Sequence, residues 1–347
     1  MDLEKRIEYF SVLGDILHDT LDNKHNIFSE RLSKLIENQK FNNLWFTPGN
    51  VRTAIGAIAD QLNEKNLRKW TDSYPVLKED FKSSRIGLIF AGNIPLAGFH
   101  DFLTVLISGN IVVARTSSKD PDLIPFLGEI LTSLNSEFES LMEFVSGTLK
   151  GFDAVIATGS NNSSRYFDYY FRKYPNIIRK NRNSIAILTG NETRDELEEL
   201  GKDIFTYFGL GCRNVSKLFV PAGYDVKALP QYWKNFSSCI DHSGYANNYD
   251  YNKAIYLVNR QKFFDAGFLL LREEINLISP VSVLHFEHYK SPAEMQLLID
   301  TIKDSLQCIV STNHIQFGKS QTPHLWDYAD GVDTLDFLLK KNLAGIL

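Results

Sequence analysis

The sequence has little cysteine: three residues in a chain of 347, at Cys212, Cys239 and Cys308. Three widely spaced cysteines supply neither a disulfide framework nor a cysteine pair with metal-ligand spacing. The other candidate ligand residues show no metal-ligand spacing either. The composition therefore predicts a protein of the reducing cytoplasm without a metal site, in which each thiol is judged by its surroundings.

Long apolar runs and an excess of one charge are also absent. No stretch approaches the ~20 apolar residues that cross a bilayer, and the charged N-terminus, MDLEKRIEYF, lacks the apolar core of a signal peptide. The net charge of −5 comes from acidic and basic residues mixed along the chain, whereas nucleic-acid-binding proteins usually carry a basic face. We therefore expect a cytoplasmic protein that neither spans a membrane nor binds nucleic acid.

What the first 80 residues do contain is helical periodicity. Apolar residues recur at three- and four-residue steps, as Leu3, Ile7, Phe10, Leu13, Leu17 and Leu21. Thr47 followed by Pro48 is typical of an N-cap and a first helical residue, and predicts a helix that continues through residues 51–62. We expect residues 1–80 to form a helical segment packed on the first domain.

From residue 85 onward, short apolar runs alternate with segments of helical length. Strands are expected at 85–91, 111–115, 141–145 and 153–159, and again at 184–188, 217–221, 280–286 and 308–312. Helices are expected at 96–108, 121–134, 162–173, 194–208, 227–236 and 292–306. This alternation predicts parallel sheets covered by helices, in two α/β domains over residues 81–187 and 188–330 followed by a C-terminal segment, 331–347.

Cys212 is the candidate nucleophile. It lies in FGLGCRNVSK, where glycines on both sides of Leu210 let the backbone bend and a ligand approach closely. Arg213 places a cation beside the thiol, which favours the thiolate. The alternative is that all three cysteines are small buried residues, and for Cys308, which opens an apolar strand, this is the better interpretation.

Asn93, in AGNIPLAGF, comes just after the carboxyl end of an expected strand, where ligands bind in open parallel sheets. A side-chain amide at such a position donates a hydrogen bond to a developing oxyanion. The alternative is that Asn93 caps the following helix.

Two more strand ends carry candidate cofactor ligands. Thr158, Gly159 and Ser160 form a strand-to-helix turn whose N–H groups are placed to bind a pyrophosphate, although no GxGxxG motif is present. Arg115 and Thr116 end an earlier strand, where the guanidinium offers a cation for a ribose phosphate. The alternative for Arg115 is an ordinary surface charge.

Taken together, these segments resemble the aldehyde dehydrogenase superfamily, and most closely the acyl-CoA reductases related to the fatty-acid reductase of bacterial luminescence (LuxC-like). The resemblance runs from about Arg85 to the C-terminus and includes the ending HLWDYADGVDTLDFLLKKN. It implies an aldehyde-dehydrogenase-like fold, in which residues 81–187 form a Rossmann-like nicotinamide-binding domain and residues 188–330 form the catalytic domain.

The resemblance also implies roles for single residues. Asn93 matches the superfamily residue that stabilises the oxyanion, and Cys212 matches the nucleophile. Arg115 stands where the superfamily has a ribose-binding Lys, and Gly159–Ser160 is similar to the turn that meets the cofactor pyrophosphate. Glu274, in REEINLISPV, resembles the Glu that holds the nicotinamide ribose, with two extra residues before the following proline.

The activity so implied is reduction of an acyl-CoA or acyl-carrier thioester to a fatty aldehyde by NADPH or NADH, through an acyl-cysteine. Hydrolytic aldehyde dehydrogenases carry a water-activating Glu where this chain has Ala186 and Ile187, and Glu192 follows too late. The resemblance further implies a homo-oligomer and acyl-activating partner proteins. The alternatives are an aldehyde-oxidising dehydrogenase with a displaced base, a cysteine acyltransferase or thioesterase without nicotinamide, and a non-catalytic subunit.

Overall fold

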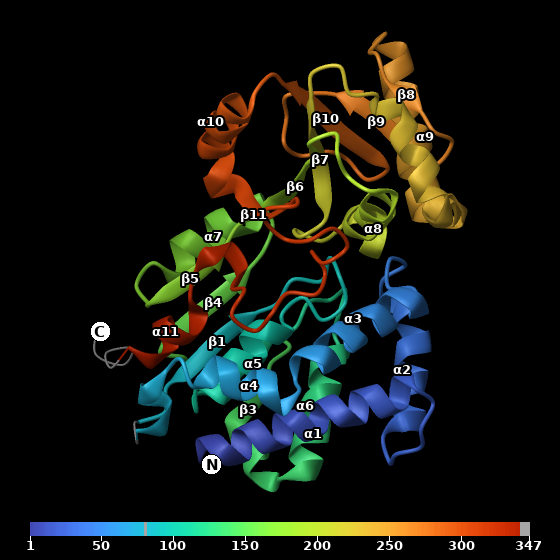
Figure 1. Cartoon of the computed structure of the whole chain (residues 1–347). Coiled ribbons are helices and arrows are strands. Elements are labelled where there is room, and N and C mark those ends of the chain that lie inside the picture. The colour runs from blue at the N-terminus through green and yellow to red at the C-terminus, as the bar shows by residue number, and fades with distance from the viewer. Residues whose placement is uncertain (80–81, 341–347) are drawn as a thin grey trace. The chain divides into compact units, whose positions relative to one another are not determined.

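A computed structural model describes residues 1–79 and 82–340. The chain divides into two compact units, each described here by itself. The first comprises residues 1–181 and the C-terminal residues from His324, and the second comprises Arg182–Pro323. Each unit contains one largely parallel sheet with helices (Figure 1), which confirms the predicted fold class of two α/β sheet domains with a helical N-terminal segment.

The first unit begins with a helical segment, as the sequence predicts, and it contains four helices. They are α1 (Leu3–Leu21), α2 (Ser29–Asn42), α3 (Pro48–Gln61) and α4 (Glu64–Thr71). The apolar stripe of α1 is buried from Leu3 to Leu17, and α1 packs on α3, α4 and α6 (Leu123–Leu134). The N-cap prediction for α3 is confirmed, because the Thr47 side chain accepts the N–H of Asn50 and Pro48 follows it.

The sheet of the first unit has five parallel strands in the order β3-β2-β1-β4-β5. The strands are β1 (Arg85–Ile89), β2 (Ile111–Arg115), β3 (Met142–Phe144), β4 (Ala154–Thr158) and β5 (Asn176–Arg179). The helices α5 (Phe99–Ile107), α7 (Asn161–Phe171) and α11 (Thr334–Leu339) complete the unit with α6. Most residues of the central strands β1, β2 and β4 are buried, because a parallel sheet is covered on both faces, whereas Phe144 on the edge strand β3 is 36% exposed.

β5 was not among the expected strands, because its apolar run is only two residues long. Its last residue, Arg179, is buried and forms an ion pair of 2.6 Å with the buried carboxylate of Asp101 on α5. Arg179 also donates to the hydroxyl of Thr334 on α11 at 2.9 Å. A charged residue is unusual in a buried strand, and here its charge is compensated by partners that are distant along the chain.

The second unit contains a six-stranded sheet in the order β11-β6-β7-β10-β9-β8, parallel except for β8. The strands are β6 (Asn183–Ile187), β7 (Val215–Pro221), β8 (Phe264–Asp265), β9 (Leu270–Glu273), β10 (Val283–Tyr289) and β11 (Leu306–Val310). The helices are α8 (Arg194–Phe205), α9 (Ser243–Val258) and α10 (Pro292–Ile302). α8, β7 and the buried Trp233 form the centre of its main apolar core.

Two parts of the second unit differ from the sequence prediction. The helix expected at 227–236 is a longer 3₁₀ segment, Val226–Asp241, in which Pro230 lacks the N–H that an α-helix requires. α9, β8 and β9 were not predicted, because the polar and tyrosine-rich sequence of α9 has no clear apolar stripe.

Candidate active site

Three loops leave the first sheet at its carboxyl edge. β1 lies at the centre, with β2 on one side and β4 on the other, so the strand order reverses at β1. Ligands bind at such a switch point, outside the carboxyl ends of the strands. Asn93 follows β1, Arg115 and Thr116 lie at the end of β2, and Thr158 ends β4. The register pairs Ile89 with both Arg115 and Ala157, so the sheet brings all three loops to one edge.

Asn93 is exposed in the loop between β1 and α5. The N-cap of α5 is Gly98, without a side-chain cap, so the alternative that Asn93 caps the following helix is wrong. The loop is tied to its surroundings at Gly92, whose carbonyl oxygen accepts a hydrogen bond of 3.1 Å from the buried Asn43 at the end of α2. A Cβ at Gly92 would overlap Ser117 in the turn after β2. The two loops are therefore in direct contact, which requires glycine at this position.

Asp120 connects the same two loops and was missed in the sequence. Its buried carboxylate accepts the backbone N–H of Leu96 at 2.9 Å. Leu96 has a left-handed backbone, with φ of 59°, a conformation that costs an L-residue about 1–2 kcal/mol. Burial raises the pKa of Asp120 to about 6. The only signal in the sequence was its place in the polar run SSKDP.

The turn after β4 has the geometry of a helix start. Ser160 is the N-cap of α7, and its hydroxyl accepts the N–H of Ser163 at 3.3 Å. Gly159 packs so closely on Ser163 that a Cβ would lie 2.8 Å from the Ser163 Cβ. The N-terminal N–H groups of α7 thus open at the same sheet edge as Arg115, whose side chain is exposed. These features fit a bound dinucleotide.

The three cysteines differ sharply in their surroundings. Cys212 is exposed, Cys239 is half-buried and Cys308 is buried. Burial raises the pKa of Cys239 to about 11 and also raises the pKa of Cys308, so neither forms a thiolate readily near neutral pH. Among the three, Cys212 is the most exposed and therefore the most accessible to a substrate.

The backbone before Cys212 is strained. Tyr207, Phe208 and Gly209 have positive φ values of 54°, 58° and 77°, directly after α8. Two consecutive non-glycine residues in this region are costly, and such strain gathers at functional sites. Cys212 lies in the next turn, three residues after Gly209, and its carbonyl oxygen accepts the hydroxyl of Ser184 on β6 at 2.9 Å.

Asn214, which the sequence interpretation missed, holds this turn together. Its side-chain oxygen accepts the N–H of Gly211 at 2.8 Å. Its side-chain amide donates to the carbonyl oxygens of Asp203 and Thr206 at 3.0 and 2.9 Å, which otherwise remain unsatisfied at the end of a helix. The 3% exposed Asn214 therefore connects the end of α8 to the Cys212 turn.

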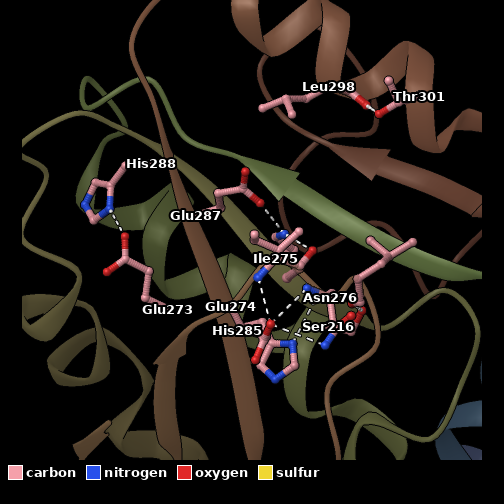
Figure 2. Close-up of polar contacts among 12 residues, drawn as sticks. Ser216, Glu273, Glu274, Ile275, Asn276, His285, Glu287, His288, Leu298 and Thr301 are labelled. Carbon is pink, nitrogen blue, oxygen red and sulfur yellow. Dashed lines mark hydrogen bonds and ion pairs between the residues drawn. The ribbon is translucent and has the colours of Figure 1, made fainter. Parts of the chain in front are cut away.

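Glu274 follows β9 in the second unit. Its carboxylate accepts the N–H groups of Ile275 and Asn276 at 3.0 and 3.3 Å and pairs with Arg272 at 2.8 Å. These contacts lower the pKa of Glu274, and the hydrogen bond from the Asn276 N–H contributes most. Figure 2 shows the carboxylate turned toward the backbone of Ile275 and Asn276, with the His285 imidazole beside it.

A family model matches more than half of the chain. It is the model described as acyl-CoA reductase (LuxC), and it covers residues 45–229. The match includes Asn93, Gly159, Ser160 and Cys212, with the loops that carry them. The chain belongs to the LuxC acyl-CoA reductase family. Glu274 lies beyond the matched residues. Comparison with curated proteins gives no match.

Solved structures of aldehyde dehydrogenases share the fold of this LuxC-family protein. An NAD-dependent aldehyde dehydrogenase from Sinorhizobium meliloti superposes with a TM-score of 0.64 at 13% identity, covering 92% of this chain and 72% of that one. The NAD⁺ complex of an aldehyde dehydrogenase from Bacillus cereus gives 0.61 at 11%, with coverage of 89% and 72%. The Mycobacterium tuberculosis aldehyde dehydrogenase with NAD⁺ gives 0.60 at 12%, with coverage of 89% and 73%. The predicted family resemblance and fold are thereby confirmed.

The LuxC-family chain has no acid at the end of β6. Ala186 and Ile187 are buried in the strand. Glu192 is half-buried and accepts hydrogen bonds from the N–H groups of Thr189 and Gly190, at 2.5 and 3.0 Å. The Glu192 carboxylate is thus used in hydrogen bonds within its own turn.

Residues 1–79 and 82–340 lack two other kinds of site. No cluster of three or more metal-ligating side chains occurs among these residues. None of their helices combines the length and the apolar character that a bilayer span requires.

Proposed function

We propose that this chain reduces an acyl thioester, carried by coenzyme A or an acyl carrier, to an aldehyde through an acyl-cysteine at Cys212. The observation that carries the proposal is that the family-matched Cys212 is exposed just after a strained turn, whereas burial keeps Cys239 and Cys308 protonated. Membership of an acyl-CoA reductase family supplies the substrate class.

The chain's own residues carry out acyl transfer. The Cys212 thiolate attacks the thioester carbonyl carbon, and the carbon–sulfur bond to the carrier breaks as the carrier thiolate leaves and takes a proton. The side-chain amide of Asn93 donates a hydrogen bond to the oxyanion that forms in this step. After reduction, the thiohemiacetal loses its hydroxyl proton, its carbon–sulfur bond breaks, and the aldehyde leaves with Cys212 again a thiolate.

The carboxyl edge of the first sheet supports a nicotinamide cofactor, NADPH or NADH. Gly159 and Ser160 at the start of α7 would hold the pyrophosphate, with Thr158 at the end of β4. Arg115 and Thr116 would meet the adenosine ribose, where a guanidinium favours a 2′-phosphate. Glu274 would hold the nicotinamide ribose. When bound, the reduced cofactor supplies the hydride that discharges the acyl-cysteine.

The residues at the end of β6 favour one direction of the reaction. Oxidation of an aldehyde to an acid requires water to attack the acyl-cysteine, and a base to activate that water. Ala186 and Ile187 stand where that base is expected, and the Glu192 carboxylate is occupied in its own turn. Hydride transfer needs no such base. The arrangement therefore favours reduction over aldehyde oxidation.

The experiment combines turnover with detection of the covalent intermediate. The protein is incubated with acyl-CoAs of increasing chain length and NADPH or NADH, while cofactor oxidation and trapped aldehyde are followed. Without cofactor, mass spectrometry should find one acyl group, on Cys212. Cys212→Ala should abolish both signals, while Cys239→Ala should keep them. Acyl labelling or turnover retained in Cys212→Ala would refute the assignment, and release of free acid without cofactor would indicate a thioesterase.

Long acyl chains, acyl-activating partner proteins, a homo-oligomer and a cytoplasmic location are proposed from the family resemblance alone. The chain-length series and a measurement of mass in solution test the first and third of these directly.

A further inference from the structure

Three consecutive carbonyl groups after Glu274 are each contacted by a polar side chain of a neighbouring strand. The Lys217 ammonium donates to the Ile275 oxygen at 2.7 Å, and His285 Nδ1 lies 2.9 Å from the Asn276 oxygen. The Ser216 hydroxyl lies 3.0 Å from the Leu277 oxygen. We call Ser216, Lys217 and His285 the carbonyl clamp.

The sheet register explains how Lys217 and His285 come together, while Ser216 lies at a register shift between β6 and β7. His285 on β10 is paired with Lys217 on β7 and with Arg272 on β9. Paired residues of adjacent strands point to the same face, so Lys217, His285 and Arg272 present three nitrogen-bearing side chains to one face of the sheet. The loop after β9 contacts all three, with Arg272 paired to Glu274.

Lys217 is the unusual member of the clamp. Its side chain is only 2% exposed, and it pairs with Glu287 at 2.5 Å. A buried ammonium is tolerated only with partners, because its desolvation is costly. Glu287 neutralises the charge, and the Ile275 carbonyl takes a further N–H. Figure 2 shows Glu287 above the loop that carries Ile275 and Asn276.

Apolar packing holds this loop at Leu277, which lies against a core cluster of the second unit. Ile275 and Ile278 are 83% and 57% exposed, so the backbone before and after Leu277 depends more on its polar contacts. The Asn276 carbonyl oxygen can only accept a hydrogen bond, so His285 Nδ1 carries the proton and donates it. Burial lowers the pKa of His285, which favours the neutral ring. The Glu274 carboxylate is in turn held by the N–H groups of Ile275 and Asn276.

We propose that the carbonyl clamp, with Lys217 at its centre, positions Glu274 for cofactor binding. Ser216 and Lys217 lie four and five residues after Cys212, on the strand that the nucleophile turn enters. The strand that follows the nucleophile therefore also sets the place of a cofactor ligand. This inference rests on the proposed function, because the role of Glu274 is part of it. Lys217 is a positioning residue, since it acts through the loop.

The test uses Lys217→Met, which keeps the length of the side chain and removes the ammonium. Hydrogen exchange of the amides of residues 274–279 should become faster, and the Kd for NADPH should rise about tenfold, as expected for loss of one charge-assisted hydrogen bond. Acylation of Cys212 by acyl-CoA without cofactor should keep its rate. Glu273→Gln is the matched control, because exposed Glu273 pairs with His288 rather than with the loop.

A double-mutant cycle shows whether Lys217 acts through Glu274. Glu274→Gln should raise the Kd for NADPH by itself, and Lys217→Met should add less than about twofold to it. An equal effect of Lys217→Met with and without Glu274→Gln would overturn the proposal, as would unchanged exchange or unchanged NADPH affinity in Lys217→Met. If Lys217→Met does not fold, Ser216→Ala serves in its place, with a smaller change in the same direction expected and no change overturning the proposal. Failure of the proposed function is seen separately, as a wild-type protein that is not acylated at Cys212.

Discussion

The carboxylate of Asp120 and the backbone N–H of Leu96 are 2.9 Å apart, and this hydrogen bond ties the turn after β2 to the loop that carries Asn93. Leu96 keeps its left-handed backbone while Asp120 is buried at 5% exposure. The proposed oxyanion donor and the proposed ribose ligands thus lie in loops that hold each other.

Asp120→Asn should change the pH dependence of stability. Burial raises the pKa of Asp120 to about 6 in the folded protein, above the ordinary value of 3.8. The folded state therefore binds this proton more tightly than the unfolded state, and the resulting stabilisation is fully present below about pH 3.8 and lost as the pH rises through about 6. A shift of about two pKa units corresponds to about 3 kcal/mol.

In Asp120→Asn the side-chain oxygen still accepts the Leu96 N–H but nothing titrates. Urea unfolding from pH 4 to pH 8 should therefore show a smaller loss of stability with rising pH than in wild type. Asp122→Asn, two residues away and exposed, removes a neighbouring negative charge that helps to raise the pKa of Asp120, and should reduce the dependence only in part. Identical pH profiles for wild type and Asp120→Asn would contradict the argument.

Asn93→Ala should slow acylation of Cys212 roughly a hundredfold, as removal of one oxyanion donor does in other enzymes. Rapid mixing with acyl-CoA in the absence of cofactor, followed by mass spectrometry, measures this step directly. Asn42→Ala removes an exposed amide that pairs with Asp122 and should leave the rate unchanged. An unaltered rate in Asn93→Ala would remove Asn93 from the mechanism.

Gly209→Ala should impair acylation beyond its effect on stability. Gly209 and Gly223 both have positive φ, 77° and 82°, so alanine at either position costs about 1–2 kcal/mol of folding free energy. A Cβ at Gly209 would also lie 3.3 Å from the Ile204 carbonyl oxygen, whereas nothing lies within 4 Å at Gly223.

The tight contact at Gly209 requires a shift of a few tenths of an ångström three residues before Cys212, and misplacing a reacting group slows a reaction, by about a hundredfold for about 1 Å. Both variants should lose similar stability in urea, but only Gly209→Ala should lose acylation rate. Equal acylation rates would show that the strained turn does not position Cys212.

Much of this architecture was predictable from local patterns. The spacing of apolar residues in α1, the Thr47–Pro48 helix start and the alternation of apolar runs with helices each reflect a few consecutive residues and the burial of one face. The Cys212 segment was recognisable for the same reason, because its glycines and its neighbours stand together in the sequence.

The tertiary structure decided what depends on partners far apart in the chain. β5 pairs with β4 and ends in Arg179, whose buried charge is paired with Asp101, 78 residues away, and the short apolar run alone did not predict this strand. The exposure that separates Cys212 from Cys239 and Cys308 follows from packing. Lysine is usually a surface residue, yet Lys217 is buried and donates to a carbonyl oxygen 58 residues later in the chain. Periodicity records which side of an element is buried, whereas the partner that compensates a buried charge is set by the folded chain as a whole.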